Sequence, residues 1–298
     1  MIFSRVPAVV VGYDGSPTAK AALRYAAGEA ARRGTSLRIV HAREITAGPA
    51  RRDPDDLLRE ARRLVRPLVA TAHVLPRVRA GAAARVLTEE SVGAELLVVG
   101  RGQLGTLGAV AGSVAIDAIC LARCPVVVVA ERLGRVPHDG AVVVGIDPEH
   151  CADVLAAGFR EAELLDKDLV VLHVCGASHR AGAGYLGSCQ DGVDRPSPLR
   201  DVVHPFQAKH PSVAVTEICQ AGRPRRVLNA ASAAASLMVV GARGHGPVAG
   251  MILGSVGQSL VWHADCPVMI VRTDAAPASG LPAGEETSGA SGLATLRS

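Results

Sequence analysis

The chain contains a tandem repeat, and this duplication constrains its fold more than any other feature of the sequence. The stretch AVVVGYD at residues 8–14 recurs as AVVVGID at 141–147, and CPV at 124–126 recurs at 266–268. A chain of 298 residues is long enough for two domains. We therefore predict a first domain over residues 1–135 (half one), a second over residues 139–273 (half two), and a tail over residues 274–298 that has the composition of a disordered segment.

Short apolar runs alternate within each half with longer segments of helical period, which is typical of βαβ units and a parallel sheet. The runs are apolar throughout, as expected where helices cover both faces of a sheet. Ser16 followed by Pro17 predicts a helix start, and Gly34 predicts its end. Five strands are expected in each half: residues 8–12, 37–41, 74–79, 95–99 and 126–130, and then 141–145, 169–173, 213–219, 237–240 and 268–271.

The composition of the chain excludes several classes of protein. Aromatic residues make up only 2% of the chain, so its cores must be built from Val, Leu, Ile and Ala. The apolar runs are far shorter than the roughly 20 residues that span a bilayer, and the N-terminus lacks the features of a signal peptide. Seven cysteines without a CxxC pair fit reduced structural thiols better than disulfides or a zinc site. We therefore expect a cytoplasmic protein without membrane contact.

A glycine-rich loop follows the fourth expected strand of each half. Residues 241–255 have the spacing G-x2-G-x9-G-S, and a helical pattern begins at the final serine. Residues 100–113 keep the later part of this spacing, but the first part is one residue shorter. The backbone N–H groups of such a loop, together with the N-terminus of the following helix, can bind a phosphate group.

These loops and the repeated strands make residues 5–273 resemble the universal stress protein family in its tandem two-domain form. The resemblance implies an α/β fold of two Rossmann-like domains of the adenine nucleotide alpha hydrolase-like type. Each domain would be a five-stranded parallel sheet of order 3-2-1-4-5 with helices on both faces. Ligands of such sheets bind at the carboxyl ends of the strands where the strand order reverses, here between the first and fourth strands.

The resemblance also implies a set of binding residues, because the nucleotide-binding branch of the family holds ATP, with Mg²⁺ as an optional companion. Asp14 and Asp147 would face the adenosine part, and Ala42 and Val174 would line the adenine pocket. The implied site is completed by glycines at the strand ends and by the glycine loops: Gly12, Gly100, Gly102, Gly112 and Ser113 in half one, and Gly145, Gly241, Gly244, Gly254 and Ser255 in half two. No catalytic residue and no metal ligand is assigned.

Each half departs from the family pattern at a different place. Half one has the shortened loop, whereas half two has Glu149 where half one has Ser16. A carboxylate at Glu149 would repel a bound triphosphate if the helix began there, unless a metal ion bridged the two. We therefore expect half one to be the better ATP site.

Two other interpretations of the glycine loops stay open. The loops could serve only as tight turns, in which case the chain is an interaction module that binds no nucleotide. Residues 100–105 also match G-x-G-x-x-G, with Glu131 as an acidic partner, which would suit a nicotinamide-dependent oxidoreductase. This motif belongs after the first strand, however, and here it follows the fourth. A Walker P-loop is excluded, because none of the three lysines follows a glycine.

Other candidate sites have simpler explanations. His41 and His173 end strands without a second ligand at suitable spacing, so we expect structural histidines rather than metal ligands. The arginines of residues 59–66 lack interleaved aromatics, which favours a solvated helix face over a nucleic-acid site. Cys120 and Cys124 are interpreted as packing residues, and no nucleophilic triad is apparent from spacing.

The favoured function is that of an ATP-binding, nucleotide-responsive stress regulator, non-catalytic or at most a weak ATPase, that acts through an unidentified regulatory protein. Residues 126–130 and 268–271, the last strands of the two sheets, would be exposed edges if they were left unpaired. We expect them to pair with each other and to form an internal pseudo-dimer of the two halves. A homodimer of whole chains is a further option.

Overall fold

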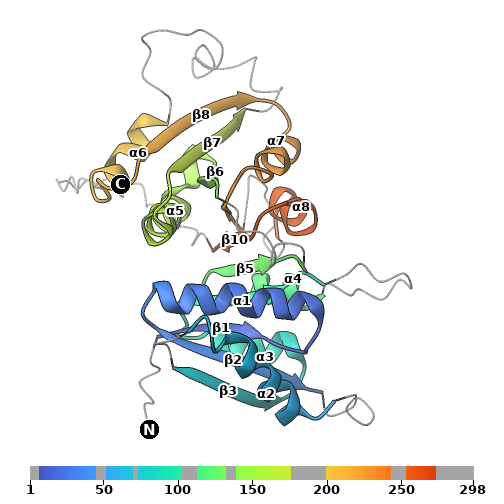
Figure 1. Ribbon diagram of the computed structural model, residues 1–298. Coiled ribbons are helices and arrows are strands. Elements are labelled where there is room, and N and C mark those ends of the chain that lie inside the picture. Colours follow the sequence, from blue (N-terminus) through green and yellow to red (C-terminus); the bar gives the residue numbers. More distant parts are fainter. Residues whose placement is uncertain are drawn as a thin grey trace, which may run out of the picture.

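Ten strands form one continuous sheet in the computed structural model, which describes residues 7–44, 52–69, 73–102, 113–131, 139–175, 199–242 and 253–272. The strand order is β3-β2-β1-β4-β5-β10-β9-β6-β7-β8. Neighbouring strands within each half are parallel and follow the predicted order 3-2-1-4-5. Helices cover both faces of the sheet (Figure 1). The predicted α/β fold is confirmed.

Helices and strands alternate along both halves. Half one contains β1 (Ala8–Gly12), α1 (Pro17–Arg32), β2 (Ser36–Arg43), α2 (Pro54–Val65), β3 (Val74–Ala80), α3 (Ala83–Ser91), β4 (Leu96–Gly100), α4 (Ser113–Leu121) and β5 (Val126–Val129). Half two contains β6 (Val142–Ile146), the short 3₁₀ helix η2 (Pro148–His150), α5 (Ala152–Leu165), β7 (Leu169–Cys175), α6 (Arg200–Gln207), β8 (Val215–Ala221), α7 (Pro224–Ala231), β9 (Leu237–Gly241), α8 (Ser255–His263) and β10 (Val268–Val271). Every predicted strand is present, with ends that differ by at most two residues.

The start and end of α1 follow the predicted signals. The Ser16 hydroxyl accepts a hydrogen bond from the Ala19 N–H at 3.2 Å, and Pro17 occupies the first helical position. Gly34 follows the helix with a φ of +62°, a conformation that glycine adopts without strain.

The two faces of the sheet bury separate cores, which explains why the strands are apolar throughout. Val9 and Val11 of β1 lie in the core beneath α1, α2, α5 and α6, whereas Val10 lies in the core beneath α3, α4, α7 and α8. Successive residues of a strand point to opposite faces. Because both faces are covered, no position of β1 can be polar without cost.

The two halves meet through an antiparallel pair of strands, as the unpaired-edge argument predicts. Val127 of β5 lies opposite Met269 of β10, flanked by the pairs Val126–Ile270 and Val128–Val268. Residues 126–128 correspond to residues 268–270 in the repeat, so each flanking pair is the symmetry equivalent of the other. Val127 and Met269 therefore lie at the centre of the junction. Figure 1 shows β5 and β10 side by side between the halves. This junction leaves β3 and β8 as the edges of the ten-stranded sheet.

Arginines from each half reach the C-terminal end of a helix in the other half. Arg101 Nη1 donates to the Ala264 carbonyl after α8 at 3.3 Å. Arg272 Nη1 donates to the Ala122 carbonyl after α4 at 3.1 Å and to the Cys120 carbonyl at 3.3 Å. A cation at these carbonyls satisfies acceptors that the helix cannot, and it complements the helix dipole.

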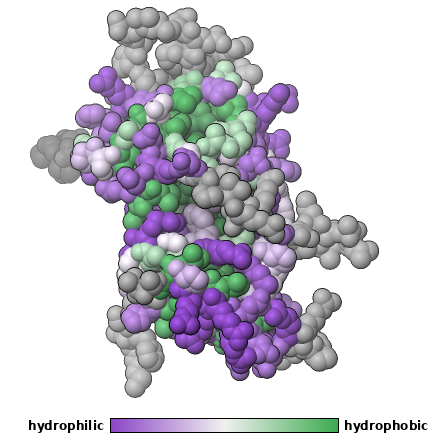
Figure 2. Space-filling view, viewed as in Figure 1, coloured by the Kyte–Doolittle hydropathy of each residue, from purple (hydrophilic) through white to green (hydrophobic). Residues whose placement is uncertain are grey.

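Helix α2 presents a charged face to solvent, as expected for the arginines of residues 59–66. Its Leu57, Leu58, Ala61 and Val65 are buried. Arg59 pairs with Asp56 on the outer face, and Figure 2 shows hydrophilic side chains gathered over this helix. None of the helices in the described part of the chain is long and apolar enough to cross a membrane.

Candidate functional site

The strand order reverses at two points of the sheet, between β1 and β4 in half one and between β6 and β9 in half two. Connections leave such a point toward opposite faces, so the carboxyl ends of the strands border a crevice. Asp14 follows β1 and Asp147 follows β6, and both residues therefore lie at these reversal points.

Both aspartates close a turn in their own loops. Asp14 Oδ1 accepts a hydrogen bond from the Ser16 N–H at 2.9 Å, and Asp147 Oδ1 accepts one from the Glu149 N–H at 3.4 Å. Such turns are typical of aspartate after a strand. The turns fix the position of each carboxylate beside the crevice.

The strand-end glycines have a packing role of their own. A Cβ at Gly100 would lie 2.7 Å from the Thr18 carbonyl carbon, so only glycine allows the end of β4 to approach the start of α1. A Cβ at Gly12 would lie 3.0 Å from Leu87 of α3, and one at Gly145 would lie 2.9 Å from Leu228 of α7. Backbone packing therefore explains Gly100, whereas Gly12 and Gly145 face the ends of leucine side chains, which can shift.

The strand-two histidines have equivalent structural contacts in the two halves. His41 Nδ1 lies 2.9 Å from the Tyr13 carbonyl oxygen, and His173 Nδ1 lies 3.1 Å from the Ile146 carbonyl oxygen. Each ring therefore holds the backbone just before an aspartate. This agrees with structural histidines, and the described residues contain no group of three or more His, Cys, Asp or Glu side chains that could hold a metal ion.

Ala42 and Val174 occupy equivalent places near the ends of β2 and β7. Both pack against the core on the side of α3, α4, α7 and α8. Val174 pairs in register with Gln220 of β8, so the two side chains share this face of the sheet.

The glycine loop of half two returns to the strand from which it leaves. The Gly254 N–H donates to the Ala242 carbonyl at 3.0 Å, which brings the start of α8 beside the end of β9. Helix α8 begins at Ser255 after Gly254, and no side chain caps it. Its first N–H groups therefore point out of the helix without the cap that Ser16 gives α1. Gly112 and Gly244 lie outside the described residues, whereas Gly102 follows β4 and Ser113 begins α4.

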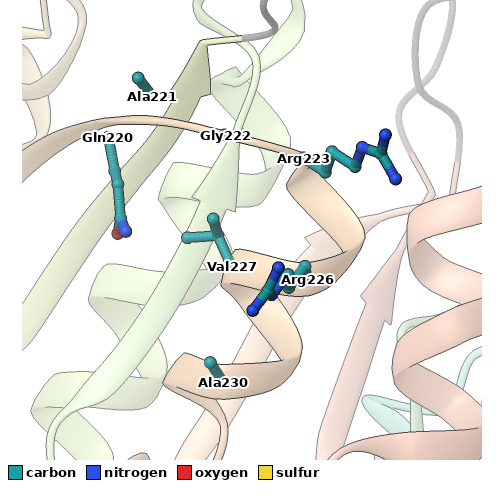
Figure 3. A pocket seen from close by; sticks show the side chains of 7 residues that line it. All are labelled: Gln220, Ala221, Gly222, Arg223, Arg226, Val227 and Ala230. Carbon is teal, nitrogen blue, oxygen red and sulfur yellow. The ribbon is translucent and has the colours of Figure 1, made fainter.

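Two neighbouring pockets flank the start of α7, close to this end of α8. One, of about 660 Å³, lies between the end of β8 and α7 and is lined by Gln220, Ala221, Gly222, Arg223, Arg226, Val227 and Ala230 (Figure 3). The other, of about 510 Å³, lies between α7 and α8 and is lined by Arg223, Pro224, Arg225, Arg226, Asn229, Ser255, Val256 and Ser259. Arg223 and Arg226 are common to both pockets.

Sequence reasoning from the glycine loops missed the arginines of α7. Their signal is visible only when the two halves are aligned at the third helix, where GAAARVLTEES at residues 81–91 corresponds to GRPRRVLNAAS at 222–232. Half two has gained two arginines there and has lost both glutamates. The basic pocket follows from this local difference between the repeats.

Glu149 precedes the first turn of the α-helix that follows β6. It lies exposed in η2, and α5 begins only at Ala152. The extra 3₁₀ turn over Pro148–His150 separates the carboxylate from the first turn of the α-helix. The pattern of the first half, where α1 begins directly after Ser16, does not apply to half two.

Comparison with known proteins places both halves in one family. The model of the Universal stress protein family matches residues 7–130 and again residues 140–272. The universal stress protein Rv2623 of Mycobacterium tuberculosis is 32% identical over 295 residues, covering 89% of this chain and 96% of that protein. A universal stress protein of Mycolicibacterium smegmatis is 30% identical over 285 residues, with the same coverage of both chains.

The fold also matches a solved structure over nearly the whole chain. The crystal structure of a universal stress protein from Archaeoglobus fulgidus aligns with a TM-score of 0.67 at 19% identity. The alignment covers 90% of this chain and 99% of that one. The same two-domain architecture is therefore present in a protein with little sequence identity.

Proposed function

The chain belongs to the universal stress protein family, and from that premise we propose that it binds ATP and acts as a nucleotide-responsive stress regulator. The observation that carries the proposal is the 510 Å³ pocket beside Ser255, where an uncapped helix N-terminus and three arginines face one space. Uncapped N–H groups and guanidinium groups are both donors that suit phosphate oxygens.

The neighbouring pocket supplies room for the base of the nucleotide. Gln220 lines the 660 Å³ pocket and pairs in register with Val174. Val174 is the residue for which the family resemblance implies contact with adenine. We propose that the base binds near Val174 and Gln220, that the first phosphate lies beside Ser255 at the start of α8, and that the second and third phosphates extend to Arg225 and Arg226.

We propose half two as the stronger site, in place of half one. Three observations favour it: the complete G-x2-G-x9-G-S spacing, the exposed position of Glu149 outside α5, and the arginines of α7. In half one the equivalent helix α3 carries Glu89 and Glu90 close to its C-terminal end. Asp14 and the start of α4 at Ser113 would form the weaker site.

The experiment compares Ser255→Asp with Ser113→Asp in the full-length protein. An aspartate at the first position of a helix favours the helix dipole, so both variants should fold, while the new carboxylate repels phosphate. Ser255 is exposed, so its replacement disturbs no packing. ATP affinity is measured by titration calorimetry with Mg²⁺, and nucleotide released from the denatured protein is identified by mass spectrometry.

We expect Ser255→Asp to lower ATP affinity about tenfold or more and Ser113→Asp to have the smaller effect, since a repulsion of about 1.4 kcal/mol is a factor of ten. The reverse order would return the main site to half one. A wild-type protein that releases no nucleotide and gives no binding heat with ATP would overturn the proposal and favour an interaction module without nucleotide.

A further inference from the structure

We infer that Arg223, Arg225 and Arg226 form a polyphosphate subsite that makes the half-two site select nucleoside triphosphates over monophosphates. This inference rests on the proposed function and adds specificity to it. The three residues occupy the start of α7 and its first turn, and all three line the 510 Å³ pocket that Ser255 also lines. Figure 3 shows Arg223 projecting from the start of α7, with Arg226 farther along the same helix.

The charge of these arginines is not neutralised within the described part of the protein. None of the three forms an ion pair with any described carboxylate, and all three are exposed. Helix α7 itself contains no acidic residue. A concave surface lined by three guanidinium groups without counter-ions attracts a multiply charged anion.

In half one, the charged side chains of the equivalent helix α3 pair with one another and with neighbouring strands. Arg85, the equivalent of Arg226, lies 3.7 Å from Glu89. Glu90 accepts from Arg79 at 2.6 Å and from Arg38 at 3.2 Å. In half two, Ala230 and Ala231 replace these two glutamates. The arginines of α7 thus have no structural partners equivalent to those of α3.

The opposite wall of the pocket adds a neutral hydrogen-bond donor. Asn229 Nδ2 donates to Ser259 Oγ at 2.9 Å and to the Arg225 carbonyl at 2.6 Å. Because Ser259 Oγ accepts this hydrogen bond, its own hydroxyl hydrogen is available for another acceptor. Ser259 and Ser255 lie one turn apart on α8, so two hydroxyl groups line the wall that faces the arginines.

These donors distinguish ligands by the number of their phosphates. Guanidinium groups bind phosphate oxygens in a forked geometry, and each additional phosphate adds charge and acceptors. One phosphate at the start of α8 needs only the helix N–H groups and Ser255. The second and third phosphates of a triphosphate would reach Arg225 and Arg226, which a monophosphate would leave unoccupied.

The test titrates the full-length protein with ATP, AMP and inorganic triphosphate, and compares wild type with the Arg225→Ala/Arg226→Ala double variant. We expect the double variant to lose ATP affinity about tenfold per arginine, while AMP affinity stays within about twofold. The ATP affinity of wild type should fall more steeply with KCl than that of the variant. Arg85→Ala, at the equivalent and acid-paired position of half one, is the matched control and should change neither affinity.

The outcomes separate this inference from the proposed function. If wild type binds inorganic triphosphate and the double variant does not, but ATP gives no binding, the arginines form a polyphosphate site, while nucleotide selection and the nucleotide proposal both fail. A second outcome is that wild type binds ATP, but the double variant loses affinity for ATP and AMP equally or keeps both affinities. This outcome overturns the subsite and leaves the nucleotide proposal standing. The Arg225→Lys/Arg226→Lys variant controls for folding, because it keeps the charge and should restore part of the ATP affinity. If it melts like wild type but binds ATP no better than the alanine variant, that result counts against a charge-based subsite.

Discussion

Arg33, directly after α1, forms an ion pair with Glu161 of α5 across the junction between the halves, and one guanidinium nitrogen contacts both carboxylate oxygens. Its Nη2 lies 2.7 Å and 2.6 Å from the two carboxylate oxygens. The same group lies 3.0 Å from Glu29 Oε2. The three side chains are at most 3% exposed. Arg33 therefore pairs with one buried carboxylate from each half, and Glu29 has Arg32 as a second cationic partner. Four residues after Glu161 the helix carries Leu165 instead of a second arginine.

The first prediction is that Arg33→Leu strongly destabilises the chain. Removal of one partner leaves Glu29 and Glu161 buried close together without their shared counter-ion, which costs about 3–5 kcal/mol. Arg32→Leu is the control, because Arg32 pairs with Glu29 but is 36% exposed, and it should cost about 1 kcal/mol or less. Urea unfolding of both variants measures the difference. Equal losses would show that Arg33 has no special role at the junction.

The second prediction concerns the pH dependence of that variant. Burial raises the pKa of Glu161, and the charge of Arg33 opposes this rise. A carboxyl group with a raised pKa binds protons more tightly in the folded state, so stability falls as pH rises through the window above the usual glutamate pKa. Without Arg33 this window extends upward. The cost of Arg33→Leu should therefore be smaller at pH 5 than at pH 8, and a cost that is independent of pH would contradict this explanation.

The fold was predictable because its signals are local and repeated. The AVVVG runs and the last strands β5 and β10 occur in both halves, so the duplication supports each of these predictions twice. The Ser16-Pro17 helix start specifies α1 in half one alone. The Arg33–Glu161 pair was not predictable, because the two residues are separated by 128 positions and Leu165 breaks the repeat. Contacts between halves depend on how the strands pair, and no periodic pattern encodes them.

The third prediction tests the junction of β5 and β10. Val128 is 3% exposed and Met269 is 0% exposed, so lysine at both positions would place one ammonium group in each of the two apolar cores. We expect the Val128→Lys/Met269→Lys variant to lose several kcal/mol of unfolding free energy. Val78→Lys is the control, because Val78 is 40% exposed on the edge strand β3, and it should change stability by about 0.5 kcal/mol or less. Urea titrations that do not separate these variants would mean that the pairing contributes little.

The fourth prediction concerns the buried thiols. Burial raises the pKa of both Cys124 and Cys266 to about 12. The thiolate is the reactive form, so both residues should resist iodoacetamide at pH 8 in the native protein and react once it is unfolded in urea. Mass spectrometry of the tryptic peptides measures the labelling of each. Rapid labelling of either cysteine in the native protein would show that the strand entries at 124–126 and 266–268 open readily.

The candidate site was less predictable than the fold, for a physical reason. A glycine motif predicts where a backbone can approach a ligand, and it indicates neither which glycines serve packing nor which side chains complete a pocket. Gly100 contacts the backbone of α1, and the arginines of α7 come from a different βα unit than the glycine loop does. Both the packing role of Gly100 and the pocket role of the α7 arginines depend on how the βα units lie relative to one another. The sequence alone does not provide that arrangement.

The last prediction uses a reciprocal exchange to test the role of Glu149. Glu149 is exposed in η2, where solvent and salt screen its charge, so Glu149→Ser should change ATP affinity by about twofold or less. Ser16→Glu makes the opposite exchange in half one, where α1 begins at once and the Ser16 hydroxyl caps it. This variant should lose about 1 kcal/mol of stability through the missing cap, and it should weaken any ATP binding at Asp14. Calorimetry with ATP and Mg²⁺ measures the affinity of both variants. A tenfold gain in ATP affinity, about 1.4 kcal/mol, from Glu149→Ser would mean that the carboxylate reaches the phosphates despite the extra turn. The shortened loop of half one would then be the milder of the two defects.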